Sequence, residues 1–224
     1  MLDGRFRSDI EKRLRPVGKN IRRTGLTADH LTTIGLVMAV AASIAIGAGA
    51  LRAGVLLLVL CALPDALDGA VAKATGSASP RGAFFDSVAD RASDALLLGG
   101  TAWYLADAHG SRWAVLPLAV LAVSMLVSYE RAKAEALGFD ARGGIMERAE
   151  RTVALALGLL FDSLLIPILG IMLVLTLFTA VQRFVRVWRQ ASAPRPETPL
   201  QARWRARRLA RTTERAWRRR QPLR

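Results

Sequence analysis

The sequence predicts an all-α integral membrane protein with six transmembrane helices, preceded by an amphipathic helix at the membrane surface. Hydrophobic residues make up 52% of the chain, yet its formal net charge is +14. The basic residues lie mainly at the two ends, with eight Lys and Arg in residues 1–30 and eleven Arg in residues 195–224. An apolar middle between basic ends is typical of a membrane protein. It argues against a nucleic-acid-binding protein as the explanation of the positive charge.

The length of 224 residues suits one domain with two basic extensions. We expect a juxtamembrane basic helix over residues 1–23, a membrane domain over 24–190 and a basic cytoplasmic tail over 191–224. The tail begins with a proline-rich linker, and we expect an interfacial or disordered basic arm that binds anionic lipid. The single cysteine, Cys61, excludes an internal disulfide.

Apolar residues recur with helical spacing between Phe6 and Val17, which predicts an amphipathic helix lying along an anionic leaflet. The alternative is a solvated basic tail. Gly25 then ends this helix, and we expect Thr27 to cap the next one.

Five apolar stretches follow, at residues 31–51, 54–73, 83–106, 113–137 and 152–181. Each of the first four suits one crossing of a hydrocarbon core of about 30 Å. The last would be about 45 Å long as a single helix, and Asp162, Ser163 and Pro167 interrupt it, so we expect two spans with a turn between them. Six spans place both basic ends in the cytoplasm, as the positive-inside rule requires, whereas five would place the arginine-rich tail outside.

Four carboxylates flank the polar loop between the second and third stretches. Asp65 and Asp68 are three residues apart, and Asp86 and Asp90 are four apart, so each pair shares one helix face. Acidic groups beside lipid-facing segments are costly, and four that repel one another usually bind hard divalent cations. We therefore expect a metal site on the cytoplasmic side. The alternative is a pair of solvated helix ends.

This stretch resembles the signature of the CDP-alcohol phosphatidyltransferases at every fixed position but one. The matching residues are Asp65, Asp68, Gly69, Ala72, Gly82, Asp86 and Asp90, and Lys73 stands where the family has Arg. From about residue 24 to 190 the chain is similar to the actinobacterial phosphatidylinositol phosphate synthase branch of that family.

The resemblance implies roles for individual residues. Asp65, Asp68, Asp86 and Asp90 would hold Mg²⁺ or Mn²⁺, with two ions expected, and Asp90 would also accept the proton of the attacking hydroxyl. The CDP-lipid would contact Asp29, His30, Leu31, Thr32, Gly69, Lys73 and Ser79. Asp94 lies one turn beyond Asp90 on the same face, where it would support the ligands.

Basic residues at three predicted helix ends form a second candidate site. They are Arg131, Lys133, Arg148, Arg151 and Arg183. The synthase branch has similar basic runs, with the Lys and Arg of the fourth span in the opposite order, and the resemblance implies that these cations bind the phosphate of the acceptor. The alternative is ordinary positive-inside flanking.

The resemblance as a whole implies a homodimeric enzyme of the cell membrane that transfers a phosphatidyl group from CDP-diacylglycerol to a phosphorylated polyol, with release of CMP. The expected acceptor is 1D-myo-inositol 3-phosphate. One alternative is another family member, such as phosphatidylglycerophosphate synthase. A second alternative is a cation or proton transporter, although transporter acids lie near mid-bilayer between repeats, whereas these lie at one end of their spans. A basic membrane anchor would leave the acidic motif unexplained.

Overall fold

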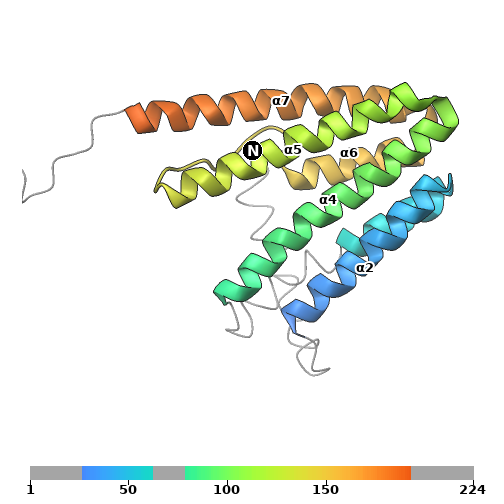
Figure 1. Cartoon of the computed structure of the whole chain (residues 1–224), viewed down its shortest axis with the longest axis horizontal. Helices are drawn as coiled ribbons and strands as arrows, with labels where there is room; N and C mark the ends of the chain where they lie inside the picture. The colour runs from blue at the N-terminus through green and yellow to red at the C-terminus, as the bar shows by residue number, and fades with distance from the viewer. Residues whose placement is uncertain (1–26, 63–78, 193–224) are drawn as a thin grey trace, which may run out of the picture.

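The computed structural model describes residues 27–62 and 79–192, and within these ranges every regular element is a helix (Figure 1). The elements are α2 (Ala28–Gly47), a short helix Leu51–Ala62, α4 (Pro80–His109), the 3-10 helix η1 (Ser111–Ala114), α5 (Val115–Ala136), α6 (Arg148–Leu160) and α7 (Asp162–Ser192). The expected all-α class is therefore confirmed for the part of the chain that is described.

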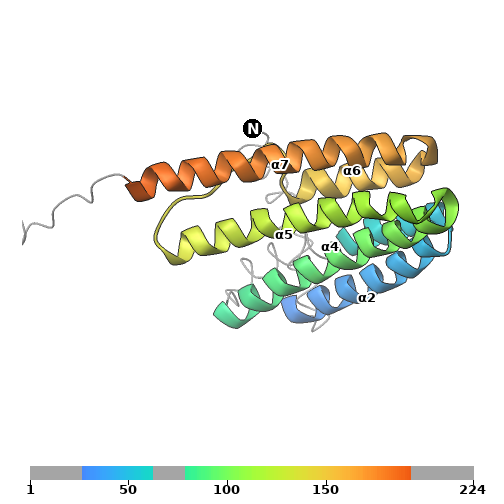
Figure 2. The ribbon, with the colours of Figure 1, turned by 45° about the horizontal axis from the view of Figure 1, so that its top comes forward.

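Successive helices run in opposite directions, so the connections alternate between two ends of the bundle. The short turns after α2, α4 and α6 lie at one end, on the right of Figure 1. The first residues of α2 and α4 and the last residues of α5 and α7 lie towards the other end (Figures 1 and 2). The described site residues of α2 and α4 lie near the starts of these helices, and therefore towards this second end.

Among the described residues, three helices are long and apolar enough to cross a membrane: Asp29–Gly47, Ser111–Ala136 and Asp162–Ser192. The helix Leu51–Ala62 is apolar but shorter. The 13 residues of α6 extend only about 20 Å, less than a hydrocarbon core of about 30 Å. The chain is thus a membrane-integral helical protein, and the count of six spans stays a prediction.

The expected division of the last apolar stretch is confirmed. α6 ends at Leu160 and α7 begins at Asp162, whose Oδ1 accepts a hydrogen bond from the Tyr104 hydroxyl at 2.8 Å. Pro167, which we expected near the turn, lies inside α7 instead. It sits in the second turn of the helix, where its missing N–H removes a single helical hydrogen bond.

The outer faces of the helices are apolar, with Val174, Val153 and Ile171 between 58% and 66% exposed. Such extensive apolar surfaces are unfavourable in water and are suited to contact with lipid chains. The interior core of the described residues draws on α2, Leu51–Ala62, α4, α5, α6 and α7, and on the loop before α6. Its members are Ala42, Ile46, Leu58, Leu97, Leu98, Leu105, Val120, Met146, Leu155, Leu159, Leu165, Leu169 and Met172.

Glycines allow α2 and α4 to pack closely. A Cβ on Gly100 would lie 2.4 Å from the main-chain oxygen of Ser43, and one on Gly47 would lie 2.1 Å from the Trp103 ring. Small residues at helix contacts let the backbones approach in this way, which is how helices associate in membranes. The spacing of α2 and α4 matters for function because both helices line the candidate site.

Gly100→Ala should therefore destabilise the protein. The new methyl group meets the main chain of α2, which cannot rotate away, and overpacking of this kind costs about 1–3 kcal/mol. The thermal midpoint of the detergent-solubilised protein measures the effect. Gly99→Ala is the matched control, because a Cβ there would have no atom of another described segment within 4 Å. It should be neutral or slightly stabilising, and equal losses in both variants would contradict this account of the packing.

Candidate active site

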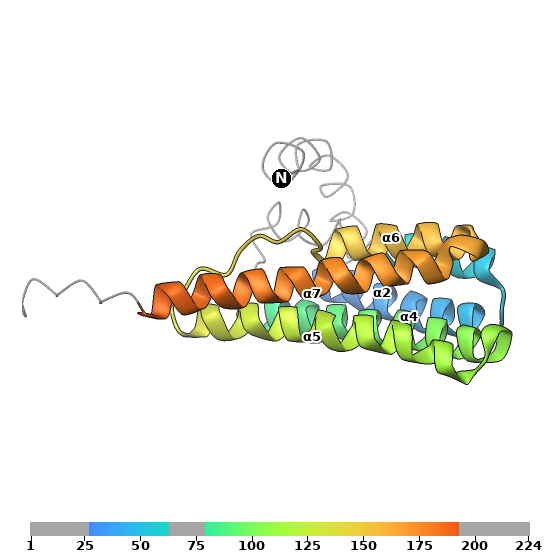
Figure 3. The same ribbon diagram turned by 90° about the horizontal axis from the view of Figure 1, so that it is seen from above.

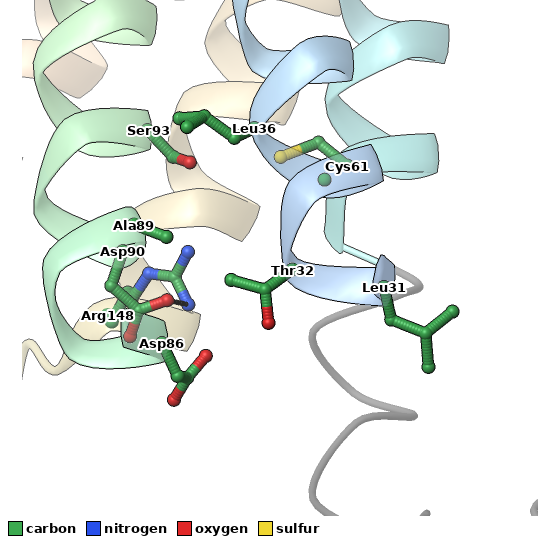
Figure 4. A pocket seen from close by; sticks show the side chains of 10 residues that line it. Leu31, Thr32, Leu36, Cys61, Asp86, Ala89, Asp90, Ser93 and Arg148 are labelled. Atoms are coloured by element: carbon green, nitrogen blue, oxygen red, sulfur yellow. Dashed lines mark ion pairs between the residues drawn. The ribbon is translucent and has the colours of Figure 1, made fainter. Parts of the chain in front are cut away.

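A pocket opens between α2, the helix Leu51–Ala62, α4 and the start of α6 (Figure 4). Asp86 and Asp90 project into it from α4, and Thr32 faces them from α2. Arg148 reaches the same space from the first turn of α6. The lining residues are Leu31, Thr32, Gly35, Leu36, Cys61, Asp86, Ala89, Asp90, Ser93 and Arg148.

Local sequence explains why α2 and α4 begin beside this pocket. Thr27 caps α2 as expected, and it forms a capping box in which its hydroxyl and the His30 ring each accept a backbone N–H. Ser79 caps α4 by accepting from the Gly82 N–H at 3.0 Å, with Pro80 in the first helical position. These caps fix where each helix starts, and so which turn carries the pocket residues.

Asp90 and Asp94 form a chain of ion pairs with two arginines of α6. An Nη of Arg148 lies 2.7 Å from Asp90 Oδ1, and its Nε lies 3.6 Å from Asp94 Oδ1. Arg151 lies 2.9 Å from Asp94 Oδ2, and its side chain is only 8% exposed. The carboxylate compensates the charge of this buried arginine, which would otherwise be costly. Asp94 therefore ties α6 to α4 immediately behind the pocket.

Two of the four predicted metal ligands, Asp86 and Asp90, lie one helical turn apart on the pocket side of α4. Their carboxylate oxygens are the donors that Mg²⁺ and Mn²⁺ prefer, so the donor set suits the expected cations. The other two, Asp65 and Asp68, lie outside the described residues. Within the described ranges, no group of three or more His, Cys, Asp or Glu side chains is placed to hold a metal ion.

The predicted CDP-lipid residues divide into three groups. Leu31 and Thr32 line the pocket. Asp29, His30 and Ser79 are engaged at the helix starts, where Asp29 pairs with Arg81 at 3.1 Å and the other two serve as caps. Gly69 and Lys73 lie outside the described residues.

The predicted acceptor residues differ in their surroundings. Arg148 lines the pocket, whereas Arg151 is buried behind it against Asp94. Arg131 pairs with Glu135 on the surface of α5 at 3.0 Å. Lys133 is exposed and, being two residues from Arg131 on the same helix, leaves α5 on a different side. The structure therefore does not bring Lys133 and Arg131 to the same place.

Arg183 on α7 is 4% exposed and is held by main-chain groups. It donates to the Val127 carbonyl at 2.8 Å and to the Gly143 carbonyl at 3.2 Å, and Glu147 lies 3.7 Å away. Nothing in the sequence indicated that Arg183 lies between α5 and the loop before α6, because Val127 and Gly143 are 56 and 40 residues away along the chain.

Sequence reasoning missed several residues of the pocket wall. Leu36 and Ser93 continue the faces of α2 and α4 that carry Thr32 and Asp86, so helical spacing could have found them. Cys61 also lines the pocket, and nothing in its local sequence indicates this.

Comparison with known proteins agrees with this geometry. Residues 26–190 match the sequence profile of the family described as CDP-alcohol phosphatidyltransferase. The chain belongs to this family. The matched range includes the signature residues Asp86 and Asp90, which line the pocket. The pocket is therefore the candidate active site.

Relatives within the family are similar over most of their length. An archaetidylinositol phosphate synthase from Methanothermobacter thermautotrophicus is 35% identical over 83% of this chain and 93% of its own. A phosphatidylinositol phosphate synthase from Cutibacterium acnes is 38% identical over 65% of this chain and 72% of its own.

Solved structures of the phosphatidylinositol phosphate synthase of Mycobacterium tuberculosis share the fold. One with bound CDP-DAG has a TM-score of 0.73 at 32% identity, covering 78% of this chain and 93% of its own. Another, in complex with manganese and citrate, has a TM-score of 0.74 at 28% identity, covering 84% and 97%.

Asp94→Ala should destabilise the protein strongly. The change leaves the Arg151 guanidinium buried with only the Met146 carbonyl, 3.4 Å away, as a described partner, and breaking a buried ion pair in this way costs about 3–5 kcal/mol. Thermal unfolding in detergent measures the loss.

Glu135→Ala is the matched control, because it also removes the acid of an arginine pair. That pair is exposed on both sides, at 46% and 51%, and such pairs contribute about 0–1 kcal/mol. If the two variants unfolded at the same temperature, Asp94 would not be the structural tie described above.

Proposed function

We propose that the protein transfers the phosphatidyl group of CDP-diacylglycerol to 1D-myo-inositol 3-phosphate, with release of CMP. The observation that carries the proposal is the pocket, in which the acids Asp86 and Asp90 and the cation Arg148 lie together. The family uses CDP-alcohols. The relatives named above differ in the lipid part of their names and share the inositol phosphate part, which supports this acceptor.

In this reaction a hydroxyl oxygen of the acceptor attacks the phosphorus that carries diacylglycerol. The new P–O bond forms as the bond from that phosphorus to the bridging oxygen of the pyrophosphate breaks, and CMP leaves with that oxygen. Asp90, at the pocket surface of α4, takes the hydroxyl proton. Such transfers depend mainly on positioning and on neutralising charge, and Asp86, Asp90 and Arg148 in the pocket suit those tasks.

Asp86 and Asp90, with Asp65 and Asp68 from outside the described residues, would hold the divalent cations, and we propose two ions, Mg²⁺ or Mn²⁺. When bound, such cations neutralise the pyrophosphate oxygens and polarise the phosphorus. The chain's own contribution is a pair of carboxylates one turn apart on a helix whose start is fixed by Ser79 and Pro80.

Arg148 is the residue best placed to bind the acceptor phosphate, because it lines the pocket and 29% of its side chain is exposed. A guanidinium can hold a phosphate through two parallel hydrogen bonds. Arg151 and Arg183 are buried against the loop before α6, where they contact the carbonyls of Met146 and Gly143 and add positive charge. Arg131 and Lys133, in the last turns of α5, do not line the pocket and stay candidates for the acceptor site.

The runner-up is another member of the family, such as a phosphatidylglycerophosphate synthase, which would use glycerol 3-phosphate in the same pocket. Both acceptors carry a phosphate, so the basic residues alone do not separate them. A transporter is disfavoured because the acidic pair lies in the first turns of α4 rather than midway along it.

The test is CMP release from labelled CDP-diacylglycerol by the purified protein, with inositol 3-phosphate, inositol and glycerol 3-phosphate offered as acceptors. Inositol 3-phosphate should be preferred. Excess EDTA should abolish release and added Mg²⁺ or Mn²⁺ restore it, and Asp86→Asn should remove activity without loss of folding. Full activity in EDTA would overturn the metal-dependent reaction.

Arg148→Gln should raise the KM for inositol 3-phosphate at least about tenfold, since losing a charge-assisted contact costs about 1.5–3 kcal/mol. The KM for CDP-diacylglycerol should change little. Arg112→Gln, at the far end of the bundle in η1, is the control. A preference of the unaltered protein for free inositol would overturn the acceptor assignment.

We further propose that both termini and the pocket face the cytoplasm, as the basic ends favour. The pocket is lined by the first turns of α2, which lie towards the end of the bundle where α7 ends (Figure 1). One orientation therefore accounts for the pocket and for both termini. A C-terminal reporter that is active only outside the cytoplasm should stay silent, and a signal from it would reverse the orientation.

A further inference from the structure

The loop between α5 and α6 takes an unusual course. After α5 ends at Ala136, the chain turns back and runs alongside the last turns of α7 before α6 begins at Arg148 (Figure 3). Ala141 and Met146 of this loop are buried, and Met146 belongs to the hydrophobic core. These two residues anchor the loop on the bundle, while most of the other residues between α5 and α6 are exposed.

One face of α7 holds the main chain of this loop at four points. Gln190 accepts from the Asp140 N–H at 3.0 Å and donates to the Asp140 carbonyl at 2.6 Å. Further along, Arg186 donates to the Arg142 carbonyl, and Arg183 to that of Gly143. The four residues of this α7 stripe are Thr179, Arg183, Arg186 and Gln190, spaced at i, i+4, i+7 and i+11 so that they share one face.

Thr179 makes the contact closest to the pocket. Its hydroxyl accepts from the Met146 N–H at 3.2 Å and donates to the Leu175 carbonyl at 2.8 Å. Thr179 is fully buried, and a Cβ on Gly144 would lie 2.4 Å from its Cγ2, so the loop passes directly against it. Non-helical backbone within a membrane protein is tolerated where such partners satisfy it.

Met146 lies just before α6, which carries the pocket residue Arg148 and the buried Arg151. Its carbonyl accepts from Arg151 at 3.4 Å, and Arg148, two residues later, reaches Asp90. A shift of Met146 would therefore be transmitted directly to the first turn of α6. Because α6 has no side-chain cap at Glu147, its start depends on how the preceding loop is held.

We propose that Thr179 is a positioning residue for the acceptor site. By fixing the Met146 amide through its hydroxyl, it sets the place of Arg148 in the pocket without touching substrate itself. The kinetic part of this inference rests on the proposed function, in which Arg148 binds the acceptor phosphate. The structural part does not.

The test compares Thr179→Val, which keeps the shape and loses the hydroxyl, with Thr179→Ser, which keeps the hydroxyl and loses the methyl. Thr179→Val should raise the KM for inositol 3-phosphate about fivefold or more, as expected for an unsatisfied buried amide. The KM for CDP-diacylglycerol should stay within about twofold of the unaltered protein. Amide hydrogen exchange should become faster at residues 144–148. Thr179→Ser should match the unaltered protein in all three measurements.

Two results would overturn the inference: equal behaviour of the two variants, or a larger effect of Thr179→Ser, which would mean that the methyl packing against Gly144 matters instead. If the unaltered protein used no phosphorylated acceptor, the proposed function would fail, and hydrogen exchange would still decide whether the hydroxyl holds the loop.

Gln190→Ala provides a second variant in case Thr179→Val folds poorly, since it releases the loop from the far end of the stripe. It should speed exchange at Asp140 and raise the same KM to a smaller extent. Arg189→Ala, at the exposed neighbouring position, is its control and should change neither. An unchanged exchange rate at Asp140 in Gln190→Ala would count against the stripe as the holder of the loop.

Discussion

Charged and polar groups enclosed among apolar helices must find partners within the protein, and this constraint shapes the whole end of the bundle that carries the site. Arg151 pairs with Asp94, and the two Nη groups of Arg183 donate to the carbonyls of Val127 and Gly143. Each of these contacts joins two segments that are far apart in sequence. The same bonds that remove the cost of burial therefore fix the spatial relation of α4, α5, α6 and α7.

Fixed charges are useful to an enzyme of this kind. A phosphoryl-transfer site stabilises charge that develops during reaction, and it does so best when its charged groups need not reorganise. Arg148 meets this condition because Asp90 and Asp94 lie on either side of its guanidinium and the α7 stripe holds the loop before it. The close contact of α2 with α4 at Gly100 adds rigidity to the opposite wall.

The helices and their starts could largely be predicted, because the signals are local. Thr27 carries its own capping signal, and Asp162 marks the turn between α6 and α7. The sharing of one pocket by Asp86, Asp90 and Thr32 followed from helical spacing and from the family resemblance. These predictions needed only contacts within a turn of helix or a motif of fixed gaps.

The surroundings of the basic residues could not be predicted in the same way. Arg131 and Lys133 look like one cluster in the sequence, but a helix sends them to different sides. The partners of Arg183 are main-chain carbonyls, which every residue possesses, so no side chain marks them. The glycines of the loop, Gly138 and Gly143, have positive φ angles of 80° and 85° and indicate turns there, but not the path along α7.

The position of Cys61 has a practical consequence. It is the one cysteine among 224 residues, and it forms part of the pocket wall. Its side chain is only 7% exposed, so a thiol-reactive probe would have to enter the pocket to reach it. Protection of this single thiol by added CDP-diacylglycerol would therefore report occupancy of the pocket without an engineered label.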